Sequence, residues 1–191
     1  MLTELSHHRL PGAIRARMRS LVLPWLLLLL AVGPAFGAGE YEVKAAHLPK
    51  FASYIQWPAA ALPSGSLVIG LVGRDPSGGT IEQALHGATV GGRRVEVRKV
   101  SATDTAALRD CAILFIGAGE EGRAADILRQ VQGRPVLTVG ETEDFALNGG
   151  MLQFILVDGQ VRFIANPGEA ERSGVKMDSN LLRLARRRIG G

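Results

Sequence analysis

The middle of the chain alternates short apolar runs with segments of helical periodicity. The apolar runs are rich in β-branched residues, and most of them stop at a glycine, which is typical of strands buried on both faces. Between them, apolar residues recur at the spacings that mark one face of a helix. The predicted strands are 67–72, 95–100, 112–116 and 136–139, and the predicted helices are 80–85 and 124–131. This alternation predicts a parallel sheet covered on two sides.

Residues 40–57 show the pattern of an amphipathic helix, because apolar residues recur there at spacings of four and three. A proline inside a helix removes a backbone donor and crowds the preceding turn. We therefore expect Pro49 to kink this helix or to split it in two. Trp57-Pro58 is expected to end it, since the residue before a proline avoids helical geometry.

The C-terminal part of the chain has a different pattern. Two β-rich runs, 151–157 and 161–165, flank Asp158-Gly159, which is a strong signal for a two-residue hairpin turn. A last helix is predicted from about 180 to 189, after an Asp178-Ser179 cap. The predicted fold class is α/β: a three-layer α/β/α domain with a mostly parallel sheet that ends in an antiparallel hairpin.

The first 38 residues have the pattern of a secretory signal peptide. Four arginines precede an apolar stretch at 21–32, and small residues follow it. A helix of that stretch rises only about 18 Å, whereas the core of a bilayer is about 30 Å thick. We expect residues 1–38 to be a signal peptide and residues 39–191 a single domain that is exported. An uncleaved membrane anchor is the alternative, and we expect no direct membrane insertion of the mature protein.

Composition and charge exclude several classes of protein. With 47% hydrophobic residues the chain has too much apolar content for a disordered protein. The formal net charge is +4, but removal of residues 1–37 leaves 18 basic and 17 acidic residues, a net charge of +1. Charge therefore gives no argument for nucleic-acid binding. The single cysteine cannot form an internal disulfide or a cysteine-rich zinc site.

Few residues in the chain have the pattern of a catalytic or cofactor site. Residues 117–122 match the glycine fingerprint of dinucleotide-binding proteins, but Glu120 and Glu121 place two negative charges where a pyrophosphate would lie. His47 and His86 have no partner at metal-ligand spacing, so we expect no metal and no cofactor. Cys111 begins an apolar run, and Asp110 beside it should raise the pKa of its thiol. These observations favour a protein that is not an enzyme.

Three glycines suggest a ligand cleft. Gly73, Gly117 and Gly140 each end a predicted strand at its carboxyl end, where open α/β sheets bind ligands, and Glu141 follows directly. The alternative is that these residues are ordinary loops above the sheet. A periplasmic small-ligand-binding protein that uses this cleft is one hypothesis for the function.

The last segment carries several arginines whose role the sequence leaves open. Their position complements the dipole of the last predicted helix, which is one explanation. Contact with an anionic lipid or an acidic partner is the other. The residues are Arg183, Arg186, Arg187 and Arg188.

The chain resembles the YfiR-like periplasmic family in three blocks, in the same order and at similar spacing. The first block is Glu40-Tyr41-Glu42-Val43-Lys44-Ala45-Ala46 with Phe51 and Trp57-Pro58. The second block is Val136-Leu137-Thr138-Val139-Gly140-Glu141 with Gly149-Gly150-Met151. The third block is Val161-Arg162-Phe163 to Asn166, with Gly174-Val175-Lys176-Met177 and Leu181-Leu182-Arg183-Leu184-Ala185. The resemblance extends over roughly residues 40–186.

This resemblance implies a regulator without catalysis. YfiR-like proteins bind the periplasmic sensor domain of a membrane-bound diguanylate cyclase and repress it, which limits cyclic-di-GMP and biofilm formation. The resemblance also implies a homodimer and redox control through cysteines. Only Cys111 matches a cysteine position of the family, so disulfide-based control is not expected here.

The contact with the partner is expected in the third block. Side chains alternate along a strand, so Ile164 points away from the face that carries Phe163. Ile164, with Val175 and Met177 in the segment that follows, is predicted to form an apolar patch for the partner. The alternative is that the last helix covers these three side chains.

Overall fold

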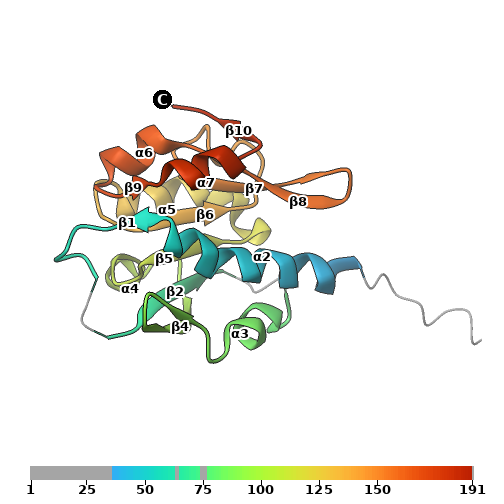
Figure 1. Ribbon diagram of the computed structural model, residues 1–191, viewed down its shortest axis with the longest axis horizontal. Helices are drawn as coiled ribbons and strands as arrows, with labels where there is room; N and C mark the ends of the chain where they lie inside the picture. The colour runs from blue at the N-terminus through green and yellow to red at the C-terminus, as the bar shows by residue number, and fades with distance from the viewer. Residues whose placement is uncertain (1–35, 63–64, 74–76, 191) are drawn as a thin grey trace, which may run out of the picture. The chain divides into compact units, whose positions relative to one another are not determined.

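A mixed sheet forms the centre of the fold in this computed structural model, which describes residues 36–62, 65–73 and 77–190 (Figure 1). Within these residues the main sheet has eight strands in the order β10-β8-β7-β6-β5-β2-β4-β3. Their bounds are β2 Leu67–Val72, β3 Thr89–Val90, β4 Arg93–Val100, β5 Ile113–Ile116, β6 Leu137–Gly140, β7 Leu152–Val157, β8 Gln160–Ala165 and β10 Arg187–Arg188.

The predicted α/β class, with a mostly parallel sheet that ends in an antiparallel hairpin, is confirmed. The pairs β2–β4, β2–β5, β5–β6 and β6–β7 are parallel, whereas β7 and β8 are antiparallel neighbours. Asp158 and Gly159 form the hairpin turn with φ of 51° and 72°. Two successive positive φ values are what a tight hairpin turn requires, so the local sequence determines this connection.

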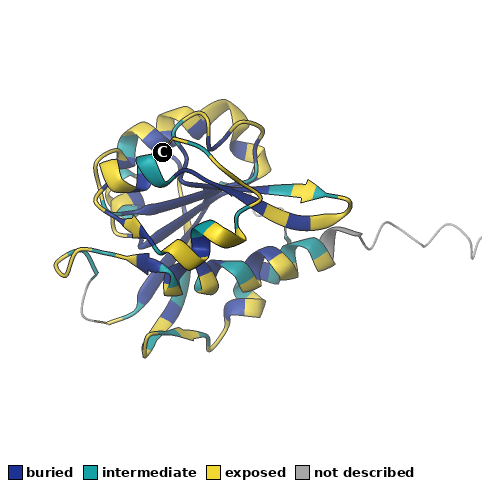
Figure 2. Ribbon diagram, turned by 45° about the horizontal axis from the view of Figure 1, so that its top comes forward, coloured by how far each residue is buried: buried dark blue, intermediate teal, exposed yellow. Residues whose placement is uncertain are grey.

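Helices cover both faces of the sheet, and Figure 2 shows the buried strands between them. On one face the core includes side chains of α2 Phe36–Ser53, α3 Thr80–Leu85, α6 Pro167–Arg172 and α7 Ser179–Leu184. On the other face the core includes side chains of α4 Thr105–Arg109 and α5 Ala124–Val131. The 3-10 helix η2 Ala118–Arg123 comes directly before α5. Within the described ranges, no helix combines the length and the apolar character needed to cross a membrane.

The helix α2 differs from its prediction at both ends. It begins at Phe36 and continues through Pro49 to Ser53, so it is not split there. Leu48 and Phe51 are almost fully buried on either side of the proline, and this packing holds the helix on the sheet. The chain then forms β1 Ile55–Gln56, which pairs with β9 Lys176–Met177. The expectation that the helix reaches Trp57 is therefore wrong, because strand pairing takes over before the proline.

The last helix is shorter than predicted. Asp178 caps it as expected, since its side chain accepts a hydrogen bond from the backbone N–H of Asn180. The helix α7 ends at Leu184, however, and the chain turns into β10 beside β8. The backbone N–H of Arg186 donates to the carbonyl of Phe163 at 2.8 Å. Without β10, the edge of β8 would present unpaired backbone groups, and pairing with them ends the helix earlier than local helix propensity predicts.

Candidate functional site

The carboxyl ends of β2, β5 and β6 lie side by side, which brings the three predicted glycines together. Val72 and Gly140 both lie opposite Ile116 in the strand register, so Gly73, Gly117 and Gly140 end neighbouring strands. The strands β4 and β5 lie on opposite sides of β2, which makes this a point where the strand order reverses. Open α/β sheets bind ligands at such points.

The side chain of Glu120 occupies the space beside Gly73. Glu120 is 3% exposed, and Arg123 pairs with its carboxylate at 2.8 Å. Gly73 has a φ of 88°, and a Cβ there would lie 2.1 Å from Oε1 of Glu120. Glycine is thus required at this position by both backbone and space. Glu120 belongs to residues 117–122, the segment that matches the dinucleotide fingerprint. Because its carboxylate fills the space beside Gly73, a phosphate has no room there.

Glu141 lies at the centre of a buried polar cluster, formed with Tyr41, Lys44 and Glu40 of α2. The hydroxyl of Tyr41 donates to Oε1 of Glu141 at 3.0 Å, and the backbone N–H of Ala118 donates to the same oxygen at 2.8 Å. The ammonium of Lys44 pairs with Oε2 of Glu141 and also with Glu40, the latter at 2.5 Å. We call these four side chains the Glu141 cluster.

The Glu141 cluster joins the first helix to the ends of two strands. The side chains of Lys44 and Glu141 are only 6% and 4% exposed, so both charges are removed from water and depend on each other. Both oxygens of Glu141 already have donors, which makes it a structural acceptor. Within the described residues, no group of three or more His, Cys, Asp or Glu side chains has the arrangement of a metal site.

The predicted ligand cleft therefore has a different form from the one expected. The glycines and Glu141 meet as predicted, but side chains of the protein fill the space above them. Glu120 lies against Gly73, and the ring of Phe145 lies where a Cβ on Gly140 would be, at 2.5 Å. Sequence reasoning missed Tyr41 and Lys44, although two polar residues on the buried face of an amphipathic helix are a signal for such a cluster.

Cys111 is a buried thiol two residues before the start of β5. Its Sγ donates to the carbonyl of Ala107 at 3.2 Å. Burial raises the pKa of this thiol to about 11; Arg98 opposes the shift, and Asp110 adds to it as the sequence suggested. A thiol that stays protonated and buried is a poor nucleophile.

The three residues predicted to form an apolar patch for the partner lie in the interior. Ile164, Val175 and Met177 are 5%, 1% and 5% exposed, so the expectation of an exposed patch is wrong. The strand β10 covers the edge beside Ile164, and Met177 pairs with Ile55 of β1. These short strands come from residues whose pairing partners are remote in sequence, which is why strand alternation alone did not predict the burial.

Other apolar side chains in the C-terminal part of the chain are exposed. Leu156 near the hairpin tip and Leu184 at the end of α7 are 56% and 63% exposed. Phe154 and Val161 share the strand face of Leu156, and both belong to the core on the α2 side. The helix α7 packs on this same side through Leu181. We call the side of the molecule that carries the exposed Val43, Leu156 and Leu184 the α2-side face.

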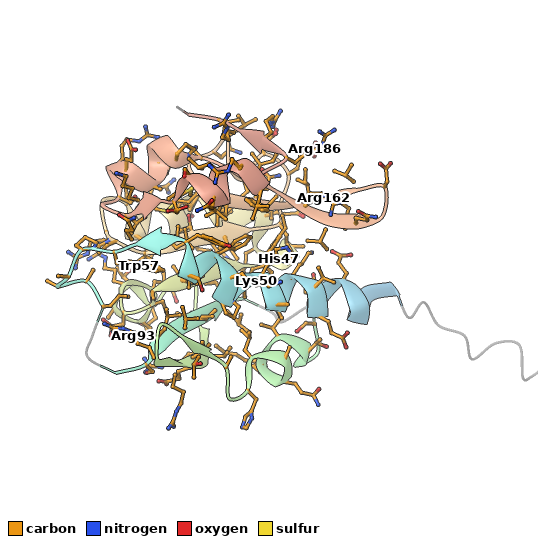
Figure 3. The ribbon with its side chains drawn as sticks, viewed as in Figure 1. His47, Lys50, Trp57, Arg93, Arg162 and Arg186 are labelled. Carbon is orange, nitrogen blue, oxygen red and sulfur yellow. The ribbon has the colours of Figure 1, made fainter. Side chains whose placement is uncertain are left out.

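Basic groups are found on the elements around the α2-side face. Figure 3 labels His47 and Lys50 on α2 and Arg186 after α7. The ring of His47 contacts that of Phe154, with centroids 6.0 Å apart, so α2 lies directly against the hairpin here. Lys50 and Arg186 are exposed. Exposed apolar side chains and exposed basic side chains therefore occur on elements of the same side of the sheet.

A solved structure shares this fold. A conserved domain protein from Vibrio cholerae O1 biovar El Tor is similar with a TM-score of 0.53 and 9% sequence identity. The match covers 78% of this chain and 60% of that chain. At this identity the likeness concerns the fold alone.

The sequence identifies the family. The sequence pattern of the YfiR/HmsC-like family matches residues 41–186, which is most of the chain, so the protein belongs to that family. The predicted resemblance is therefore confirmed. The match begins at Tyr41 of the Glu141 cluster and ends at Arg186, just before β10, so it includes the other seven strands of the main sheet. Membership supports, in broad terms, a periplasmic and regulatory role.

Proposed function

We propose that this protein binds the periplasmic sensor domain of a membrane-bound diguanylate cyclase and holds the enzyme inactive. Repression of this kind limits cyclic-di-GMP and hence biofilm formation. The observation that carries the proposal is the family match over residues 41–186. The predicted signal peptide, residues 1–38, lies outside the described residues except for Phe36 to Ala38, which belong to the start of α2. Export of the protein to the periplasm is part of the proposal.

The mechanism is a shift in the conformational equilibrium of the cyclase. A regulator that binds the inactive state more tightly than the active one moves the population toward the inactive state. A rigid binding surface loses less entropy on association, which raises affinity. The Glu141 cluster supports such rigidity, since it ties α2 to the strand ends through buried charges.

We place the contact on the α2-side face. Leu156, Leu184 and Val43 are large apolar side chains that the fold leaves exposed, and burial of apolar surface is the main favourable contribution to most protein–protein association. Ile164, Val175 and Met177, which the sequence suggested as contacts, belong in this proposal to the interior that supports the face. The proposed contact thus moves from the three interior side chains to exposed ones on α2, β7 and α7.

The test compares three leucines of similar exposure. Leu156→Asp and Leu184→Asp change the α2-side face, whereas Leu147→Asp changes a leucine that is 58% exposed in the loop after β6. All three variants should fold, because exposed substitutions change the free energy of unfolding by only about 0.5 kcal/mol. Binding to the purified sensor domain is measured by calorimetry, and cyclic-di-GMP is measured in cells.

The expected result is a loss of binding and a rise in cyclic-di-GMP for Leu156→Asp and Leu184→Asp, with Leu147→Asp unchanged. If all three variants bind and repress as the unchanged protein does, the contact lies elsewhere. If the unchanged protein shows no affinity for any sensor domain encoded beside it, the proposed function itself is wrong.

We also propose that the protein acts as a homodimer, as the family resemblance implies. Sedimentation equilibrium of the exported protein measures this directly. A mass equal to one chain across the micromolar range would contradict it. The same measurement on Leu184→Asp shows whether the α2-side face takes part in self-association or is free for the partner.

A further inference from the structure

Five exposed arginines lie on elements that meet at one edge of the main sheet. The strand β10 is the last strand on this side, and it pairs with β8. Figure 3 labels Arg162 on β8 and Arg186 directly before β10, where the backbone N–H of Arg186 donates to the carbonyl of Phe163. We call the five exposed side chains the arginine edge: Arg162, Arg183, Arg186, Arg187 and Arg188.

The dipole of α7 does not explain the arginine edge. The influence of a helix dipole on a charged side chain falls off within the last turn. The helix α7 ends at Leu184, so Arg183 is the one member of the arginine edge that belongs to it. Arg186 lies between the helix and β10, and the next two arginines form β10 itself. Of the two explanations that the sequence left open, the dipole therefore accounts for one arginine.

The positive charge of the arginine edge is not neutralised within the protein. Among the described residues, no carboxylate forms an ion pair with any of its members. Arg162 and Arg183 donate to the neutral side chains of Gln160 and Asn180. By contrast, η2, α5 and α6 each contain an arginine that pairs with a carboxylate three residues away. The charge of the arginine edge is thus available to an external anion.

The charge of the mature chain is divided unevenly between two parts. Residues 159–191 contain seven basic and three acidic residues, whereas residues 38–158 contain 11 basic and 14 acidic residues. The net charge of +1 is therefore the result of +4 in the C-terminal part and −3 in the rest. A protein with this distribution turns its C-terminal part toward a negatively charged surface.

The geometry of the arginine edge suits an extended anionic surface. Side chains alternate along a strand, so Arg187 and Arg188 of β10 point to opposite faces of the sheet. A small anion on one face is out of reach of the arginine on the other. A broad surface that approaches the edge of the sheet meets the arginines of both faces, because arginine has a long side chain and binds phosphate through two parallel hydrogen bonds.

An exposed apolar side chain lies within the same segment. Leu184 comes between Arg183 and Arg186 and is 63% exposed, the largest exposed fraction among the large hydrophobic residues that the structure describes. Basic groups beside an exposed apolar side chain are typical of segments that lie at a membrane surface, where the cations contact phosphates and the apolar group enters the headgroup boundary. This combination favours a bilayer over an acidic protein as the anionic surface.

We propose that the arginine edge docks the protein on a bilayer surface that carries anionic phospholipid headgroups. The guanidinium groups donate to phosphate oxygens, and Leu184 enters the boundary between the headgroups and the acyl chains, without insertion of a helix. Leu184 also belongs to the α2-side face, so docking holds that face close to the membrane in which the proposed partner is anchored. The docking itself is a property of this chain and does not rest on the proposed function.

Co-sedimentation of the purified exported protein with vesicles tests the docking. Vesicles of phosphatidylcholine with about 30% phosphatidylglycerol are compared with vesicles of phosphatidylcholine alone, at about 50 mM NaCl. The partition coefficient onto the anionic vesicles should be at least about 100-fold larger, because each basic group near an anionic surface strengthens binding about fivefold. At about 500 mM NaCl most of this difference should disappear, since salt screens exposed charges.

Variants assign the binding to the arginine edge. Arg187→Gln combined with Arg188→Gln removes two of its charges and should weaken binding to the anionic vesicles about tenfold or more. Arg94→Gln combined with Arg134→Gln is the matched control, because it removes two exposed arginines at the start of β4 and before β6, and it should change binding less than about twofold. Arg187→Lys combined with Arg188→Lys keeps the charge and should bind within about threefold of the unchanged protein.

Three results would overturn the proposal. The first is equal partition onto the two kinds of vesicle at low salt. The second is equal weakening by the edge pair and the control pair, which would show attraction to the net charge alone. The third is the absence of vesicle binding together with a loss of affinity of the edge pair for the purified sensor domain in lipid-free solution, which would assign the arginine edge to an acidic protein surface. The vesicle measurements contain no cyclase, so their failure and the failure of the proposed function are distinguishable.

Discussion

The most constrained side chains in this protein are the charged ones that the fold buries. Lys44 and Glu141 are 97 positions apart in sequence and form an ion pair in the interior, with Tyr41 and the backbone of Ala118 as additional donors. Removing one partner of such a pair leaves the other charge buried without compensation. Single substitutions therefore measure how much the fold depends on the junction between α2 and the sheet.

We predict that Glu141→Gln lowers the free energy of unfolding by about 3 kcal/mol, because Lys44 keeps only Glu40 as a counter-charge. Urea denaturation measures the change. The double variant Lys44→Met with Glu141→Gln should be less destabilised than the sum of the two single variants, since it removes both charges. A change below about 0.5 kcal/mol for Glu141→Gln would show that the pair is not needed for stability.

Cys111 gives a prediction about pH. Burial raises the pKa of its thiol from 9.0 to about 11, so between these values the unfolded chain ionises while the folded one does not. The free energy of unfolding should therefore fall by about 2 kcal/mol from pH 9 to pH 11 on account of this group. Cys111→Ala, measured over the same range, should lack this part of the decline. Identical slopes for the two proteins would contradict the burial of the thiol.

At the scale of elements, short strands decide how the helices are placed. The pairing of β1 with β9 fixes the end of α2 beside the start of α7, where Asp178 donates its backbone N–H to the carbonyl of Tyr54 at 2.8 Å. The strand β10 completes the sheet beyond β8. At the strand ends, glycines allow side chains to approach the backbone closely, as Glu120 does at Gly73 and Phe145 does at Gly140. Substitution of such a glycine by alanine tests how tight this packing is.

Gly140→Ala should destabilise the protein by about 2 kcal/mol, since the added Cβ would lie 2.5 Å from the ring of the buried Phe145. Gly122→Ala is the matched control. A Cβ there meets nothing within 4 Å, so we expect no loss and a gain of as much as about 1 kcal/mol. Thermal unfolding measures both. If the two variants behave alike, the packing around Gly140 is looser than described.

For the whole molecule, the net charge depends on whether the predicted signal peptide is removed. The full chain has a formal net charge of +4, and cleavage after residue 37 reduces it to +1. We predict that the protein isolated from the periplasm begins within a residue or two of Ala38, which intact-mass spectrometry measures. It should then elute from a cation-exchange column at low salt. Recovery of the complete 191-residue chain from the periplasm would contradict the predicted cleavage.

Much of the fold was predictable because its patterns are local. The ranges 67–72, 80–85 and 124–131 are the observed bounds of β2, α3 and α5. Apolar periodicity over a few residues determines such elements, and Asp158-Gly159 determines the hairpin turn. The family could also be identified from three blocks of sequence, and it is the family that the comparison finds.

The site was predictable only in part, because its decisive contacts join remote residues. The sequence by itself determined that Gly73, Gly117 and Gly140 would meet, since strand ends in a parallel sheet share an edge. Only the tertiary structure decided that Glu120 and Phe145 fill that edge, that Lys44 finds Glu141, and that Ile164 is covered while Leu184 is exposed. Local periodicity reports which residues tend to be buried, whereas the partner that buries each one depends on how the elements pack.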